Sequence, residues 1–245
     1  CAAKCPYCDF NSHVRNNIDQ KQWLRSYLSE INRVSKNTSS RVLDSVFFGG
    51  GTPSLIEPWV INDILNEIQK HWTTKDNFEV TLEANPGSVD AKNFKAYKSA
   101  GVNRISMGIQ SLNEKDLKAL GRTHTVKEAL SAFEIAQQNF TAVSFDLIYA
   151  RQNQKLTQWE VELNQALDLG ANHMSLYQLT IEQNTAFGDR YNRGLLKGLP
   201  SDDISAELYD ITSDLCEDRG FSAYEVSNYA QEGSESVHNL VYWRY

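Results

Sequence analysis

The sequence predicts an α/β fold in which strands and helices alternate and the strands build a parallel sheet. Short apolar runs such as 42–48 and 142–149 have the length and composition of buried strands. Stretches with apolar residues at helical spacing follow them. Polar residues or glycine stand at the C-terminal end of each strand, where the active-site loops of an α/β barrel lie. Periodicity alone fits a doubly wound sheet or a barrel, and the polar strand ends favour the barrel.

The elements can be placed in order along the chain. A first amphipathic helix is expected over residues 19–36, because Trp23, Tyr27 and Ile31 recur at helical spacing. The predicted strands cover residues 42–48, 78–82, 104–109, 142–149 and 173–179, with a sixth strand expected before Cys1. The predicted helices that follow the strands lie at residues 60–68, 88–100, 126–138, 156–169 and 202–219. Residues 181–200 are predicted to be a connecting segment, and residues 221–229 alternate like one extra strand.

Composition and charge exclude several classes of protein. Hydrophobic residues make up 41% and charged residues 22%, which is typical of a globular protein, and no apolar run approaches the roughly 20 residues of a membrane span. The net charge of −7, without a cluster of lysine and arginine, argues against a nucleic-acid partner. Four cysteines, three of them within the first eight residues, indicate a reducing cytoplasm rather than a disulfide framework. The fourth, Cys216, is expected to be a buried apolar residue of a helix.

Cys1, Cys5 and Cys8 form a C-x3-C-x2-C motif. Thiolates at this spacing can meet one soft metal centre from a single loop. A structural zinc site closes with a fourth Cys or His at a regular spacing, and here the nearest imidazole is His13, outside such a spacing. Three thiolates on a [4Fe-4S] cluster leave one iron without a protein ligand and therefore free for chemistry. The motif predicts an iron–sulfur cluster, with a structural zinc-binding module as an alternative.

The motif, with the aromatic Tyr7 before its third cysteine, resembles the signature of the radical S-adenosylmethionine (SAM) superfamily. The resemblance implies an open, partial (β/α)6 TIM-like barrel over residues 1–180, followed by a C-terminal α+β extension over residues 181–245. It implies that SAM binds the open iron, and that an electron from the cluster splits the sulfonium to give a 5′-deoxyadenosyl radical. Because the chain starts on a cluster ligand and stops in an aromatic-rich run, a fragment truncated at both ends is expected.

Polar groups at the strand ends are further candidates for binding residues. The run from Gly49 to Pro53 either lets the backbone approach a ligand or forms a plain glycine turn. The carboxylate of Glu83 can accept hydrogen bonds from a ribose or an ammonium, or it faces solvent. Asp146 is flanked by apolar residues and needs a partner where it is buried. The planar fork of Arg122 suits a carboxylate.

Together these motifs resemble, across nearly all 245 residues, the family of oxygen-independent coproporphyrinogen III oxidases and their HemW-type heme chaperone relatives. The resemblance implies that Cys1, Cys5 and Cys8 are cluster ligands. It implies a SAM shell that consists of Tyr7, Gly50, Gly51, Thr52, Glu83, Gln110, Arg122 and Asp146, with Gln178 as a further candidate at the end of the last strand. The chain departs from the family at residues 150–154, which replace the usual Gly-Leu-Pro, so a different loop is expected after Asp146.

Two features favour the heme chaperone branch of this family. The oxidases carry a further cysteine two residues after the third, where this chain has Phe10. The end of the chain matches the H-N-x-x-Y-W element of the chaperones, in which His238 would bind heme iron while Tyr242 and Trp243 pack on the porphyrin. A structural histidine among core aromatic residues is the alternative for His238.

The branch implies a protein that binds heme and delivers it to respiratory hemoproteins, with a [4Fe-4S] cluster, SAM and heme or a porphyrin as its ligands. The alternative is an oxygen-independent coproporphyrinogen III oxidase that decarboxylates propionates to vinyl groups. The sequence leaves open whether the chain is an enzyme, whether it forms a homodimer, and whether a cytoplasmic protein of this kind meets the inner membrane when it delivers heme.

Overall fold

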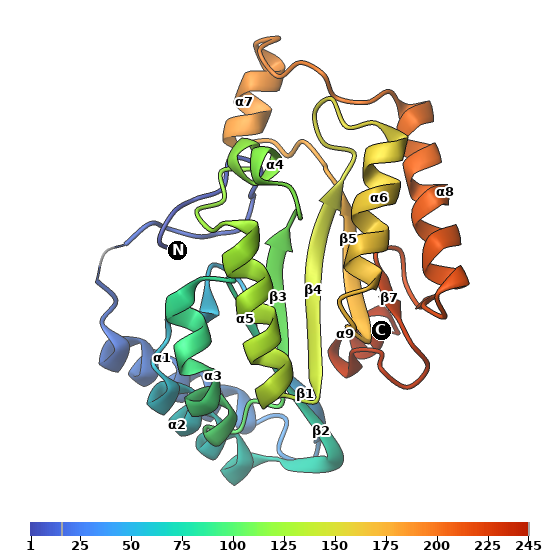
Figure 1. Cartoon of the computed structure of the whole chain (residues 1–245). Coiled ribbons are helices and arrows are strands. Elements are labelled where there is room, and N and C mark those ends of the chain that lie inside the picture. Colours follow the sequence, from blue (N-terminus) through green and yellow to red (C-terminus); the bar gives the residue numbers. More distant parts are fainter. Residues whose placement is uncertain (16, 245) are drawn as a thin grey trace.

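The computed structural model describes residues 1–15 and 17–244, except for the side chains of residues 88–91. Within these residues the strands are β1 (Val42–Phe48), β2 (Thr73–Ala84), β3 (Arg104–Gln110), β4 (Ala142–Tyr149), β5 (His173–Gln178), β6 (Ser222–Ala223) and β7 (Asn228–Ala230). They form one sheet in the order β1-β2-β3-β4-β5-β7-β6 (Figure 1). The first five strands are parallel, and β7 and β6 continue the sheet as antiparallel strands.

Helices follow the strands in the alternation that the sequence predicts. They are α1 (Gln20–Ser35), α2 (Pro58–His71), α3 (Ser88–Ser99), α4 (Glu114–Ala119), α5 (Val126–Asn139), α6 (Leu156–Leu167), α7 (Ala186–Asn192), α8 (Asp202–Asp218) and α9 (Val237–Trp243), with a short 3-10 helix η1 (Pro53–Leu55). The local sequence explains where several of these helices begin. Thr125 and Glu128 form a capping box at α5, and the hydroxyl of Ser201 accepts the Ile204 N–H at α8.

The strand order decides between the two architectures that the sequence allowed. Because the parallel strands β1 to β5 lie side by side in sequence order, every crossover moves in the same direction. Right-handed crossovers then place the connecting helices on one face, whereas a doubly wound sheet reverses its order and has helices on both. Figure 1 shows α3, α5 and α6 in front of the sheet and α8 beside α6. The sheet is therefore a curled half-barrel with helices outside.

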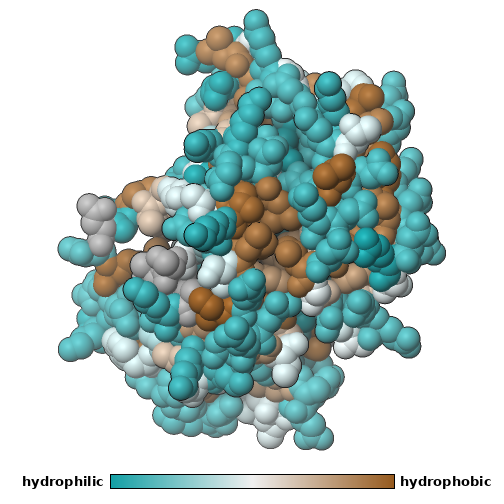
Figure 2. Space-filling view, in the orientation of Figure 1, coloured by the Kyte–Doolittle hydropathy of each residue, from teal (hydrophilic) through white to brown (hydrophobic). Residues whose placement is uncertain are grey.

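The two faces of the sheet differ in polarity because successive residues of a strand point to opposite sides. The helix-facing positions form the apolar core with α5 and α6, and they include the fully buried Leu82, Ile105, Met107, Phe145 and Met174. The alternate positions face the hollow of the half-barrel and carry polar groups, among them Glu83, Ser106 and Asp146. The outer surface is mostly hydrophilic, with hydrophobic side chains gathered between the helices (Figure 2).

The C-terminal region differs from the sequence prediction in three places. The single strand predicted at residues 221–229 is wrong, because β6 and β7 are two short strands that pair antiparallel with each other. The connecting segment 181–200 contains α7, and the aromatic end of the chain forms α9. These elements are too short for periodicity to show them. The strand expected before Cys1 lies outside the described residues, and the domain boundary at residue 180 stays a prediction.

Two further expectations concern single features of the chain. Cys216 is a fully buried residue of α8, as predicted. In the part of the chain that the structure describes, no helix has both the length and the apolar character needed to cross a membrane.

Candidate functional site

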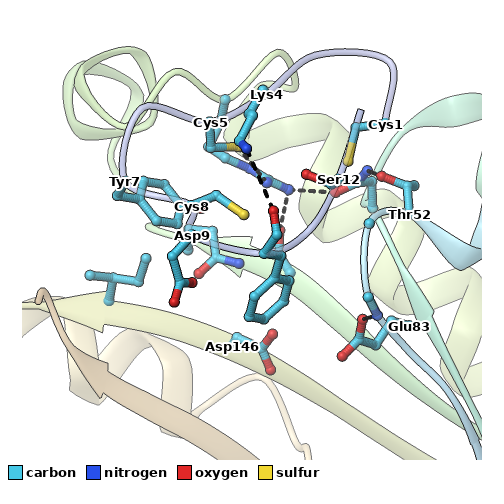
Figure 3. A pocket seen from close by; sticks show the side chains of 18 of the residues that line it. Cys1, Lys4, Cys5, Tyr7, Cys8, Asp9, Ser12, Thr52, Glu83 and Asp146 are labelled. Carbon is cyan, nitrogen blue, oxygen red and sulfur yellow. Dashed lines mark hydrogen bonds between the residues drawn. The ribbon is translucent and has the colours of Figure 1, made fainter. Parts of the chain in front are cut away.

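A cavity of about 410 Å³ lies at the C-terminal ends of the parallel strands, beneath the cysteine-bearing N-terminal loop (Figure 3). Its wall contains every residue that the sequence predicts for the cluster and for SAM, although these residues come from seven separate parts of the chain. They are Cys1, Cys5, Tyr7, Cys8, Gly50, Gly51, Thr52, Glu83, Gln110, Arg122, Asp146 and Gln178. Because parallel strands end at the same edge of the sheet, their loops converge there.

The N-terminal loop is fixed to two neighbouring elements. The Phe187 N–H of α7 donates to the Pro6 carbonyl at 2.8 Å. The Pro6 ring lies against Gly121, after α4, so closely that a Cβ on Gly121 would be 2.5 Å from Pro6 Cδ. Within the loop, the Cys8 N–H donates to the Cys5 carbonyl at 3.2 Å. The loop therefore holds its cysteines at the mouth of the cavity (Figure 3).

The three thiols of this loop fit a cluster better than one ion. All three are free and partly buried, and Figure 3 shows them arranged around the cavity mouth. Among the described residues, no three Cys, His, Asp or Glu side chains converge closely enough to hold a single metal ion. Zinc requires each sulfur within about 2.3 Å of one centre. A [4Fe-4S] cube takes each thiolate on a separate corner, so more widely spaced sulfurs suit it.

The glycine run at the end of β1 is bound to Glu83 of β2. The Gly50 N–H donates to the Glu83 carboxylate at 3.0 Å, with Gly50 in the left-handed region at φ +119°. A Cβ at Gly51 would come within 3.3 Å of Cys1 Sγ, so glycine allows the loop to approach the cysteines. Burial raises the pKa of Glu83, and the hydrogen bond from Gly50 opposes that effect. The loop and the acid therefore form one wall of the cavity.

Asp146 of β4 is the most strongly perturbed acid in the cavity. Burial, followed by the nearby charge of Glu83, raises its pKa to about 7. Its carboxylate accepts a hydrogen bond from the Ser106 hydroxyl at 3.4 Å. The partner that the sequence required for a buried acid is thus the Ser106 hydroxyl of the neighbouring strand β3. Near neutral pH, Asp146 can either donate or accept a hydrogen bond.

Arg122 connects the cysteine loop to the strand ends. Its Nη1 donates to Cys5 Sγ at 3.3 Å, and its Nη2 donates to Asn85 Oδ1 at 2.7 Å and to the Gly108 carbonyl at 2.8 Å. Asn85 Nδ2 in turn donates to the Thr52 hydroxyl at 3.3 Å. Sequence reasoning missed Asn85 as a site residue, although it stands two positions after Glu83 in the same strand-end motif.

Gln110 has a strained backbone at the end of β3. Its φ of +75° lies in the left-handed region, which residues other than glycine rarely adopt, and the pairing of β3 with β4 is irregular there. Such strain is typical of functional sites. Ser106 and Tyr177 also line the cavity, and their place on inward-facing strand positions is the signal that would have found them.

His238 lies outside this cavity, on α9. The imidazole ring of His238 stacks on Phe47 of β1 with the ring centroids 4.4 Å apart. The backbone N–H of His238 donates to the Glu79 carboxylate at 3.0 Å. Tyr242 and Trp243, the aromatic residues predicted to pack on a porphyrin, are 73% and 58% exposed. Burial lowers the pKa of His238 and so favours the neutral imidazole. The structure thus separates the heme candidate from the cysteine site.

Comparison with known proteins assigns the family. Residues 1–160 match the family model of the Radical SAM superfamily. The heme chaperone HemW of Haemophilus influenzae is 42% identical over 251 aligned positions, and HemW of Escherichia coli is 38% identical over 247. Both alignments cover all of this chain and 64% of the relative, so the chain spans less than two thirds of their length. The bovine mitochondrial radical S-adenosyl methionine domain-containing protein 1 is 37% identical over 245 positions, with 55% of it covered.

Solved structures share the fold. The coproporphyrinogen III oxidase HemN of Escherichia coli superposes with a TM-score of 0.83 at 20% identity, over 96% of this chain and 54% of HemN. The archaeal Elp3 of Methanocaldococcus infernus gives a TM-score of 0.60 at 16% identity, over 80% of this chain and 50% of Elp3. With a family match over 160 of 245 residues and the cysteine motif at the mouth of the half-barrel, this chain belongs to the Radical SAM superfamily.

Proposed function

We propose that this chain is a heme chaperone of the radical SAM type, which binds a [4Fe-4S] cluster and SAM at the barrel mouth and heme on α9. The observation that carries the proposal is the convergence of three free thiols and the polar strand ends on one cavity. The identity of 42% and 38% to two proteins named HemW supports the chaperone branch. In this proposal residues 1–180 hold the cluster and SAM, residues 181–245 carry heme, and the cytoplasmic protein delivers heme to respiratory hemoproteins.

The cluster, when bound to Cys1, Cys5 and Cys8, would supply the electron for reductive chemistry on SAM. The residues of this chain bind and orient the SAM molecule. The backbone at Gly50 and Gly51 would approach the amino acid part of SAM, and Glu83 would accept hydrogen bonds from an ammonium or a ribose hydroxyl. The remaining groups, Tyr7, Thr52, Gln110, Asp146 and Gln178, complete the polar wall around it.

Heme would bind at α9, which carries one nitrogen ligand and two aromatic rings. The lowered pKa of His238 keeps its imidazole in the neutral form, which is the form that ligates iron. Tyr242 and Trp243 stand on the same helix as His238, and aromatic rings of this kind could pack on a porphyrin.

The cluster is tested by anaerobic reconstitution with iron, sulfide and a reductant, followed by analysis of both elements. We expect about four iron and four sulfide per chain, and a large loss of both in Cys8→Ala. The matched control is Cys216→Ala, because Cys216 is a buried thiol of α8 outside the cavity. One zinc per chain without sulfide would establish the zinc-binding alternative and contradict the proposal.

Heme binding is tested by absorbance titration of His238→Ala and of a control, His71→Ala. We expect the variant at His238 to lose heme affinity by at least about tenfold, because it loses the iron ligand. The control should bind as the wild type does, because His71 ends α2 and hydrogen bonds to Glu67 there. Equal heme affinity in the two variants would contradict the heme site.

Oxidase activity provides a further test. The protein should not convert coproporphyrinogen III to protoporphyrinogen with SAM and reductant under anaerobic conditions, because Phe10 stands where the oxidases carry a cysteine. Measured conversion would replace the chaperone proposal with the oxidase alternative.

A further inference from the structure

The position of Gln110 in the cavity wall depends on a strained turn. Its φ of +75° lies in the left-handed region, and its side chain lies over Gly108, where a Cβ would come within 2.8 Å of Gln110 Nε2. A residue other than glycine keeps such a backbone conformation only where the surrounding contacts hold it. The contacts that hold Gln110 must therefore come from the residues next to it and from their partners.

A buried carboxylate of α6 holds the two residues that follow Gln110. The Ser111 hydroxyl donates to Glu162 Oε1 at 2.6 Å, and the Leu112 N–H donates to the same oxygen at 2.7 Å. Ser111 and Glu162 are both buried, so water replaces these bonds poorly. The Ser111 oxygen in turn accepts the Asn113 N–H at 3.0 Å. Glu162 therefore satisfies donors of the turn that would otherwise be buried without an acceptor.

The charge of Glu162 is balanced by Arg151, which comes from the loop after β4. Arg151 Nη2 donates to Glu162 Oε2 and, at 3.0 Å, to Asp116 Oδ2 of α4. Its Nη1 donates to the Ile148 carbonyl at 2.6 Å. A buried carboxylate without a counter-ion is strongly unfavourable. Arg151 therefore allows the Glu162 carboxylate to lie inside the protein, next to the turn.

We infer that Glu162 and Arg151 are positioning residues for SAM, which act by holding Gln110 in the cavity wall. The inference rests on the proposed SAM site and adds to it two residues that do not line the cavity themselves. The guanidinium neutralises the buried carboxylate, the carboxylate binds the turn, and the turn sets the direction of the Gln110 amide.

SAM affinity, measured by equilibrium dialysis on cluster-loaded protein, tests the pair by charge compensation. We expect Arg151→Met to weaken SAM binding by at least about fivefold, because it leaves Glu162 buried and unpaired. Glu162→Gln should do the same, because its amide N–H groups face the donors of Arg151. The double variant should recover most of the lost affinity. It no longer contains either charge of the pair, and the amide oxygen at position 162 still accepts from the turn.

Two further variants separate this route from its alternatives. Arg151 also reaches α4 through Asp116, so Asp116→Asn is the matched control: it removes a charged partner of Arg151 but no contact of the turn. It should change SAM affinity by less than about twofold. In Gln110→Ala, the addition of Arg151→Met should weaken SAM binding by no more than about twofold, because residues that act through one another are not additive. A fivefold loss in Asp116→Asn, or additive losses in the second comparison, would overturn the inference.

Hydrogen exchange in the same samples without SAM provides a second measurement. We expect faster exchange at the Leu112 amide in Arg151→Met and in Glu162→Gln, and a return toward the wild-type rate in the double variant. Unchanged exchange, or unchanged SAM affinity, in both single variants would overturn the inference. A wild type that does not bind SAM would instead contradict the proposed function, while the exchange rates would still show whether the pair holds the turn. The two failures are therefore distinguishable.

Discussion

At the scale of single residues, the cavity brings together two carboxylic acids whose negative charges repel each other. Asp146 and Glu83 point into the same hollow from β4 and β2, and burial raises the pKa of each of them (Figure 3). Two acids that share a partly dry space cannot both ionise without cost. The folded protein is therefore less stable when both acids are charged, and hydrogen-bond donors or a positive charge beside them would relieve that repulsion.

Replacement of Asp146 by asparagine is expected to stabilise the metal-free protein at high pH. The folded chain holds the Asp146 proton with a pKa of about 7 against an ordinary 3.8. The contribution of the Asp146 side chain to the free energy of unfolding is therefore fully present below pH 4, and it is lost as the pH rises through about 7. Urea unfolding should show Asp146→Asn more stable than wild type by about 2 to 4 kcal/mol at pH 8, with the difference vanishing toward pH 4. An equal increase in the free energy of unfolding in the exposed control Asp210→Asn would show that the effect does not come from the buried carboxyl of Asp146.

Gly121 is expected to be indispensable for the position of the cysteine loop. An alanine there would bring its Cβ to 2.5 Å from Pro6 Cδ, in addition to the strain of φ +69°. Gly194 is the matched control, because its φ is +67° and nothing lies within 4 Å of a Cβ there. Both alanine variants should lose about 1 kcal/mol to backbone strain. Only Gly121→Ala should lower the iron content after reconstitution, and equal iron content in both would refute the packing argument.

At the scale of elements, one carboxylate fixes α9 to the sheet. Glu79 of β2 accepts hydrogen bonds from the Ser236 hydroxyl at 3.1 Å and from the Val237 and His238 N–H groups at 3.1 and 3.0 Å. These N–H groups belong to the first turn of α9, where a negative charge also suits the helix dipole. The heme candidate His238 is thus positioned by a residue 159 positions earlier in the chain.

Glu79→Gln is expected to loosen α9 and to weaken heme binding with it. The amide offers one acceptor oxygen in place of two, and it leaves buried Arg104, 3.7 Å from Glu79, without its counter-ion. Loss of one partner of a buried ion pair costs about 3 kcal/mol. Hydrogen exchange should become faster in residues 237–243, while the exposed control Glu232→Gln leaves it unchanged. Equally slow exchange in Glu79→Gln would show that α9 is held by other contacts.

At the scale of the whole molecule, the cysteine loop links parts of the chain that are distant in sequence. The Pro6 carbonyl binds the α7 backbone, the Pro6 ring packs on the turn after α4, and Cys5 accepts from Arg122. The loop after Asp146, for which a shape different from the family's stays a prediction, contacts two helices. Buried Arg151 there pairs with Asp116 of α4 and with Glu162 of α6, so α4 is also held from its other side.

Cluster loading is expected to stabilise α4 and α7 as well as the loop itself. A ligand that binds only the folded loop shifts the opening equilibrium of the segments packed on it. Hydrogen exchange with mass spectrometry should show slower exchange in residues 114–122 and 186–192 after reconstitution, and no change in α2. Protection confined to residues 1–15 would show that the loop moves independently of the strand ends.

The sequence by itself determined the local features of this protein. The alternation of elements predicted the five parallel strands, and β1 occupies the predicted residues 42–48. The cysteine spacing predicted the family that the comparison then showed. The strand-end positions predicted which residues would share a cavity, because parallel strands end at one edge. These features depend on neighbours in sequence, so a pattern in the chain reveals them.

Only the tertiary structure decided which distant groups meet. It placed Arg122 on Cys5, set His238 against Phe47 away from the cavity, and divided residues 221–229 into two strands. Contacts of this kind depend on the curl of the sheet, the register of its strands and the docking of short helices. Periodicity encodes which face a side chain takes but not which partner it finds there, because that partner is fixed by packing across the whole barrel.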